Sequence, residues 1–173
     1  MRTVYLLVYH SPLFPAHWGL WIPNAGSTTI GKTVHVFGDV ANGFEHEFKR
    51  NYEPDGTNRR NSLIELAQVE DDHVVDSPGE DFSVDTNPLD DIERVALNIP
   101  APSKSLLSYA EASHLSHCLT FSRIMLFNQA RKSTTKVEIQ NCQTWLRQLL
   151  EALIAAHIVP SSALDILDNA PRN

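Results

Sequence analysis

Through the first half of the chain, hydrophobic residues are patterned as strands. Short runs rich in Val, Ile, Tyr and Phe alternate with segments that contain Pro, Gly and Asn, as is typical of strands joined by turns. The predicted strands are residues 3–9, 17–22, 33–37, 44–52 and 63–69. The first is almost continuously apolar, which indicates a strand buried on both faces.

The second half is patterned as helices. Residues 106–129 contain no Gly or Pro, which predicts a largely helical stretch, and residues 136–140 predict a short extended piece. The strongest helical pattern is residues 142–157, in which apolar positions recur at helical spacing. Ser161 or Ser162 would cap a short last helix at 163–167.

An antiparallel sheet followed by helices predicts an α+β fold in which the sheet packs against the helices. The 173 residues suffice for one domain with a sizeable core, so we expect a single domain over residues 1–173. The net charge of −7 argues against a nucleic-acid partner. No apolar run reaches 18 residues, so we expect no membrane span.

The residues at the start of the chain are not those of a secretory signal. Two cysteines, Cys118 and Cys142, are too few for a disulfide framework. We therefore expect a reducing, cytoplasmic location.

Acidic residues are concentrated between residues 70 and 93, where Lys and Arg are absent. Outside this segment, bases outnumber acids. The segment has few aromatic residues and several turn formers, so we expect a solvated, mobile insert at 70–93. The alternative is a lid, or a docking site for a basic partner.

Cys142 has a position that favours chemistry. It follows Asn141, a good helix N-cap, and would open the long helix. Unpaired backbone N–H groups and the helix dipole at this end favour a thiolate, which is the nucleophilic form of cysteine. The alternative is a buried structural cysteine, and this is the interpretation we favour for Cys118, which lies among Leu and Phe residues.

Two histidines lie on neighbouring predicted strands. If the hairpin that joins them is symmetric about Gly26, His17 and His35 are cross-strand neighbours on one face. Alternation then gives the opposite face to Trp18, Leu20, Ile22, Val34 and Val36. One face is therefore apolar, and the other carries two imidazoles that could serve a thiol as general base. The alternative is two unrelated histidines.

A metal or organic cofactor is not expected. His114, His117 and Cys118 have helical spacing that would suit zinc, but the sequence offers no second cluster at ligand spacing. It also contains no phosphate-binding glycine loop, dinucleotide fingerprint or nucleophile elbow.

The order of these motifs resembles that of known enzymes. A strand, then HWGLWIP, then GKTVHVFGD, then a distant NCQTWL at a helix start is similar to the circularly permuted papain-like fold of lecithin:retinol acyltransferase-type proteins. The permuted PPPDE-type isopeptidases share a strand His and an Asn-Cys helix start, and NlpC-type cell-wall peptidases share the fold in unpermuted order. The segments FEHEFKRNY, SLIELAQVE and IERVALNIPAP also resemble a group of small fungal proteins.

The resemblance implies roles for individual residues. Cys142 matches the family nucleophile, His17 the general base and His35 the third, orienting position. The backbone N–H of Cys142 would help to form an oxyanion hole. The implied chemistry is acyl transfer through a covalent acyl-enzyme on an ester, thioester or amide.

Some features depart from that pattern. The acyltransferases usually have Asn-Cys-Glu-His-Phe where this chain has Asn-Cys-Gln-Thr-Trp at 141–145. The loop between the histidines is longer, the acidic segment has no counterpart, and a hydrophobic C-terminal anchor is absent from this sequence. The substrate class therefore stays open.

Three functions follow from the sequence. The first is a cysteine-dependent hydrolase or acyltransferase with a small-molecule or acyl substrate. The second is an isopeptidase whose partner is a ubiquitin-like protein. The third is a non-catalytic protein that binds a small molecule or a partner on the same fold. In each case, the residues expected to line the binding site are Trp18, Trp21, Asn141 and Trp145.

Overall fold

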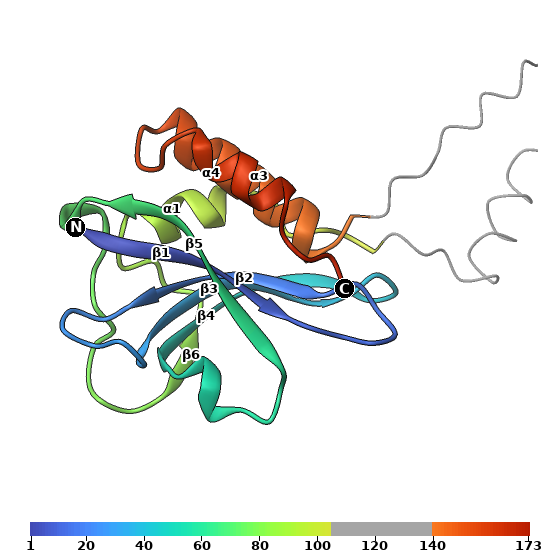
Figure 1. Ribbon diagram of the computed structural model, residues 1–173, viewed down its shortest axis with the longest axis horizontal. Coiled ribbons are helices and arrows are strands. Elements are labelled where there is room, and N and C mark those ends of the chain that lie inside the picture. The colour runs from blue at the N-terminus through green and yellow to red at the C-terminus, as the bar shows by residue number, and fades with distance from the viewer. Residues whose placement is uncertain (105–139) are drawn as a thin grey trace, which may run out of the picture.

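The computed structural model describes residues 1–104 and 140–173. Figure 1 shows a twisted sheet with helices on one of its faces. The strands are β1 (Arg2–Tyr9), β2 (His17–Pro23), β3 (Gly31–Asp39), β4 (Gly43–Tyr52), β5 (Asn61–Val69) and β6 (Ser83–Asp85). The α-helices are α1 (Asp91–Asn98), α3 (Cys142–Ala155) and α4 (Ser162–Asp168), and two short 3₁₀ turns are η1 (Pro54–Gly56) and η2 (Asp71–His73).

The sheet is antiparallel throughout, with the strand order β5-β1-β2-β3-β4-β6. The five predicted strands are confirmed, and each extends by only one or two residues beyond its predicted ends. The α+β class, with an antiparallel sheet against helices, is therefore confirmed. No helix in residues 1–104 or 140–173 has the length and apolar character needed to cross a membrane.

The main core lies between the sheet and the helices. Helix α3 packs across β2 and β3, and α4 packs against β5. Every second residue of β2 and β3 points into this core, as the alternation predicted: Trp18, Leu20, Ile22, Val34 and Val36. A smaller cluster on the opposite, open face contains Leu7, Tyr9, Trp21 and Tyr52. The two histidines therefore lie on the face opposite the one that α1, α3 and α4 cover, which we call the open face.

The register of β2 against β3 differs by two residues from the predicted symmetric hairpin. Leu20 pairs with Val34, so the hairpin is centred on Ser27, one residue later than expected. The Ser27 hydroxyl accepts hydrogen bonds from two backbone amides of the loop, which fixes this asymmetric turn. Because a shift of two residues preserves the faces of a strand, His17 and His35 stay on one face, as diagonal rather than opposite neighbours.

The long helix is confirmed with its predicted start. Helix α3 begins at Cys142 and ends at Ala155, two residues before the predicted end, since His157 has a positive φ of 60°. Helix α4 covers the predicted last helix with one further residue at each end. The predicted helix at 106–129, which includes Cys118, and most of the predicted extended piece at 136–140 lie outside the described residues.

The acidic segment 70–93 is exposed over most of residues 78–88, but its last part is built into the fold. Strand β6 pairs with β4, and Asp90 caps α1 by accepting a hydrogen bond from the Glu93 backbone N–H at 3.0 Å. Asp90 and Glu93 are almost fully buried, where they bind the equally buried cations Lys32 and Arg50. These two carboxylates neutralise the buried cations of β3 and β4.

Candidate active site

Asn141 sets the start of α3 and therefore the position of Cys142. The Asn141 Oδ1 atom accepts hydrogen bonds from the backbone N–H groups of Gln143 at 2.9 Å and Thr144 at 3.2 Å. In return, the Thr144 hydroxyl accepts from the Asn141 backbone N–H at 2.8 Å. This capping box confirms the predicted N-cap and makes Cys142 the first residue of the helix.

The Cys142 thiol is buried beside the start of β2. It is 7% exposed, and its hydrogen bond within the described residues is a long one, 3.9 Å, to the Ala16 carbonyl oxygen. Burial raises the pKa of the thiol, although the backbone N–H groups of Trp18, Cys142 and Gln143 act in the opposite direction. The expectation that the helix start would lower this pKa is therefore wrong for this state, because desolvation outweighs the favourable amides.

His17 and His35 form a hydrogen-bonded pair on the open face. The His17 Nε2 and His35 Nδ1 atoms are 2.8 Å apart, and the rings meet edge to face. Gly19 makes this approach possible, because a Cβ atom at that position would lie 3.0 Å from the His35 Cβ. The structure thus brings together the two histidines that the sequence placed on one face.

Glu47 extends the pair to a chain of three side chains. It lies on β4 directly opposite His35, and its Oε1 atom is 3.0 Å from His35 Nε2. The hydrogen bond from His35 lowers the pKa of Glu47 to about 2, so the carboxylate is ionised near neutral pH and can only accept a hydrogen bond.

The charge of Glu47 fixes the tautomer of both rings. His35 must donate from Nε2 to the carboxylate, and a neutral His35 then accepts at Nδ1. His17 therefore donates from Nε2, which leaves the lone pair of its Nδ1 atom available as a base. Burial lowers the pKa of both imidazoles, that of His17 to about 3, so both rings are neutral near pH 7.

His17 and Cys142 border the same apolar cavity. This cavity has a volume of about 500 Å³ and lies at the junction of β2, the end of β3 and the start of α3. Its other walls are mostly hydrophobic, with the exposed Phe14 at the edge together with Val40 and Phe44. An apolar group bound here would therefore lie against both the thiol and the candidate base.

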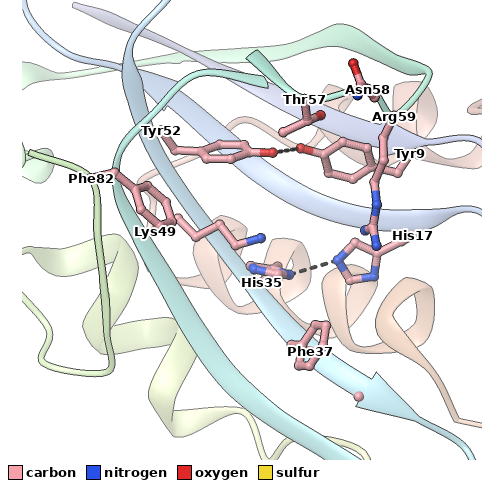
Figure 2. Close-up of a pocket in the computed structure, with 11 residues that line it drawn as sticks. Tyr9, His17, His35, Phe37, Lys49, Tyr52, Thr57, Asn58, Arg59 and Phe82 are labelled. Carbon is pink, nitrogen blue, oxygen red and sulfur yellow. Dashed lines mark hydrogen bonds between the residues drawn. The ribbon is translucent and has the colours of Figure 1, made fainter. Parts of the chain in front are cut away.

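A second cavity lies on the other side of His17, over the open face of the sheet. Figure 2 shows its walls, which combine the two imidazoles with aromatic rings and the cations Lys49 and Arg59. Its volume is about 600 Å³. The Tyr9 and Tyr52 hydroxyls hydrogen-bond each other along one wall, and burial together with this bond raises the pKa of Tyr9. His17 and Gly38 border both cavities.

Gln143 holds the Cys142 and His17 segments together. Its Nε2 atom donates to the carbonyl oxygens of Ala16 at 2.8 Å and Arg172 at 3.1 Å. The Ala16 backbone N–H also donates to the Arg172 carbonyl at 2.8 Å, and the Trp18 indole donates to the Pro171 carbonyl at 3.0 Å. The C-terminal segment therefore braces the start of β2 against the start of α3.

The aromatic residues expected at the binding site lie elsewhere. Trp145 is fully buried in the main core, where its indole donates to the Ile99 carbonyl at 3.2 Å. Trp18 is buried on the same side of the sheet, and Trp21 is buried in the open-face cluster. Of the four expected residues only Asn141 borders the cavity that Cys142 shares with His17.

Sequence reasoning missed Glu47 and Gln143 as parts of the site. Glu47 could have been found from the tight turn after β3, because pairing Asp39 with Gly43 places residue 47 opposite His35. The role of Gln143 depends on contacts with distant segments of the chain, for which no local pattern exists. The metal-like cluster of His114, His117 and Cys118 lies outside the described residues.

The arrangement thus defines an α+β protein in which a cysteine at a helix start borders the same cavity as the first residue of a His-His-Glu chain on the sheet. In comparisons with known proteins, the model of a family of unknown function, DUF6540, matches residues 4–160. The chain belongs to this family. No curated protein and no solved structure matches it.

Proposed function

We propose that this protein is a cysteine-dependent hydrolase or acyltransferase, built on a circularly permuted papain-like architecture. The observation that carries the proposal is the cavity bordered by both Cys142 and His17, with His17 oriented by His35 and Glu47. The order of the elements supports it: two His-bearing strands precede the helix that begins at the cysteine, as in the permuted enzymes that the sequence resembles.

The mechanism begins from a neutral thiol and a neutral imidazole. The Cys142 side chain turns from the Ala16 carbonyl toward His17 Nδ1, which takes the thiol proton. The sulfur attacks the substrate carbonyl carbon and forms a C–S bond, and the carbonyl electrons move onto oxygen. The backbone N–H groups around the sulfur, those of Trp18, Cys142 and Gln143, are the candidate donors to this oxyanion.

The leaving group then departs with the proton held by His17, and a thioester to Cys142 remains. Water or a second nucleophile gives its proton to His17 and attacks the thioester carbonyl. The C–S bond breaks, and the sulfur recovers the proton from His17. Glu47 stabilises the transient imidazolium through His35, a role that needs a carboxylate ionised at neutral pH.

The raised pKa of the thiol favours this general-base route over a preformed thiolate–imidazolium pair. Neither group is charged at rest, and the charge pair forms only with substrate in place. A substrate that excludes water from the apolar cavity would strengthen the interactions of the charges that develop there.

Trapping of the acyl-enzyme tests the proposal. The wild-type protein is mixed with p-nitrophenyl esters and with alkyl thioesters of increasing chain length, and intact-mass and peptide spectra are recorded. The expected result is an acyl adduct on Cys142 that hydroxylamine removes. The Cys142→Ser protein should lack this adduct, whereas Cys118→Ser should retain it.

Two results would contradict the proposal. If no ester or thioester leaves an adduct on Cys142, or if Cys142→Ser turns over substrate at the wild-type rate, the covalent mechanism is wrong. The fold would then serve binding alone.

A further inference from the structure

The second cavity has a chemical character of its own. It is formed on the open face of the sheet, and two cations stand at its walls, Lys49 from β4 and Arg59 from the loop before β5. Figure 2 shows the Lys49 side chain directed toward His35 and the Arg59 side chain directed toward His17, with the Tyr9 and Tyr52 rings along another wall.

We propose that this cavity binds an oxyanion, a carboxylate or phosphate, carried by the leaving portion of the substrate, and that Arg59 and Lys49 are its ligands. The identification of the bound group as the leaving portion rests on the proposed function, because it assumes that the protein cleaves its substrate. The binding site itself depends only on the cavity and its cations.

Arg59 is free to accept an anion. Its guanidinium lies over the Tyr9 ring, 6.0 Å from the ring centre, and its side chain is exposed. In residues 1–104 and 140–173, no ion pair joins it to a carboxylate. A guanidinium presents a fork of N–H donors that matches a carboxylate or phosphate.

Lys49 is the second ligand and is already partly oriented. Its Nζ atom lies 3.3 Å from Glu47 Oε1 and 5.2 Å from the centre of the Tyr52 ring. The ammonium has three donors, so Glu47 leaves others for a ligand. The rings of Tyr9, Tyr52 and Phe82 wall the same cavity, which suits a planar group attached to the anion.

We expect a bound substrate to occupy both cavities, with its scissile bond between them. Cys142 borders only the apolar cavity, so the acyl group that becomes attached to sulfur lies there. His17 borders both cavities, and it is the group that would protonate the departing atom. The leaving portion is therefore expected on the side of His17 where the cations are.

Anion binding would also change the pKa of His17, the candidate base. Burial, His35 and then Lys49 and Arg59 lower the pKa of His17. An anion between the two cations would cancel their part of this effect and make His17 a stronger base once substrate is bound. Binding of the leaving portion would thus help to activate the nucleophile.

Equilibrium binding to the wild-type protein tests the site without any turnover. The probes are 4-hydroxybenzoate and phenyl phosphate, which carry the two candidate anions, and 4-hydroxybenzamide, a neutral analogue of the first. Calorimetry measures Kd, and imidazole resonances report whether His17 and His35 sense the ligand. We expect an anionic probe to bind at least tenfold more tightly than the amide, and higher salt to weaken only anion binding.

Arg59→Gln supplies the decisive variant and Arg60→Gln its matched control. Arg60 is the next residue and is equally exposed, but it does not border the cavity. Arg59→Gln should weaken anion binding about tenfold, and Lys49→Gln should weaken it by a similar factor. Arg60→Gln should leave Kd within about twofold. Because both arginine side chains are exposed and that of Lys49 is 22% exposed, the variants should keep the wild-type circular dichroism spectrum.

The results separate the two proposals. Anion binding that needs Arg59, without an acyl adduct on Cys142, would keep the site and reject the enzyme. Equal binding of the amide and the anions, or equal losses in Arg59→Gln and Arg60→Gln, would overturn the site and leave the acyl-enzyme test unaffected.

Discussion

Replacement of Glu93 with alanine should lower the free energy of unfolding by about 3–5 kcal/mol, the typical cost of removing one partner from a buried ion pair. Glu93 is fully buried on α1. Its carboxylate accepts hydrogen bonds from Arg50 at 2.5 and 3.1 Å, from Lys32 at 3.0 Å and from the Leu89 backbone N–H at 2.7 Å. Among the buried acids of the acidic segment, Asp90 and Glu93, only Glu93 pairs with two cations.

The size of this loss depends on the partners that Lys32 and Arg50 keep when Glu93 is replaced. Arg50 keeps its bonds to Asp85, and Lys32 keeps Asp90 and a backbone carbonyl. Neither cation can reach water where it lies, since both side chains are at most 1% exposed. Glu93→Ala therefore leaves two buried cations with fewer carboxylate partners, and it leaves the Leu89 amide without its acceptor.

Urea denaturation followed by circular dichroism measures this loss. Glu80→Ala is the matched control, because Glu80 lies in the same segment but is exposed, and its replacement should change stability by less than about 0.5 kcal/mol. A loss below about 1 kcal/mol for Glu93→Ala, or equal losses in both variants, would refute the conclusion that the acidic segment holds the sheet through buried ion pairs.

Four further predictions concern the site. Alkylation of Cys142 by iodoacetamide should be slow at pH 7 and accelerate only above the ordinary thiol pKa of about 8.5, and fast labelling at pH 7 would contradict the burial argument. Glu47→Gln should slow acyl-enzyme formation by about 10–100-fold and give mixed His17 tautomers in nitrogen NMR spectra. A single His17 tautomer together with the wild-type rate would contradict the role of Glu47 in orienting the two histidines. Because the folded-state pKa of His17 lies near 3, below its ordinary value of about 6.5, the native state binds fewer protons than the unfolded state. The free energy of unfolding should therefore fall as the pH decreases from about 6.5 to 5. His17→Gln should make this dependence on pH less steep in urea titrations, and an unchanged dependence would contradict the lowered pKa of His17. Gln143→Ala should lower the free energy of unfolding by about 1–3 kcal/mol in the same assay, since two hydrogen bonds, to the carbonyl oxygens of Ala16 and Arg172, are lost. An unchanged stability would contradict the bracing role of Gln143.

Local pattern predicted most of the fold. The five long strands, the start of α3 and the face shared by His17 and His35 all follow from alternation and capping, which depend on neighbouring residues. Helix α1 was missed because its eight residues open with acids, and its apolar face emerges only once Asp90 and Glu93 are paired with cations from the sheet. The two-residue error in register arose from hydrogen bonds within the loop, which composition does not reveal.

The site was predictable only as far as sequence neighbours determine it. Asn141 and Cys142 are adjacent, so the helix start was readable. The pKa of the thiol was not, because it depends on burial by residues far apart in the chain. The tryptophans expected to line the binding site are buried in the two hydrophobic clusters, whereas Phe14, Val40 and Phe44 border the cavity that Cys142 shares with His17.

The hydrogen bonds made by the C-terminal segment have a practical consequence. The Arg172 carbonyl accepts from the Ala16 amide and from Gln143, on either side of the thiol. Removal of residues 172 and 173 would take the acceptor from the Ala16 amide and one of two acceptors from Gln143, while Cys142, His17, His35 and Glu47 are all retained. Purified samples should therefore be checked for loss of these residues before a weak activity is attributed to the protein itself.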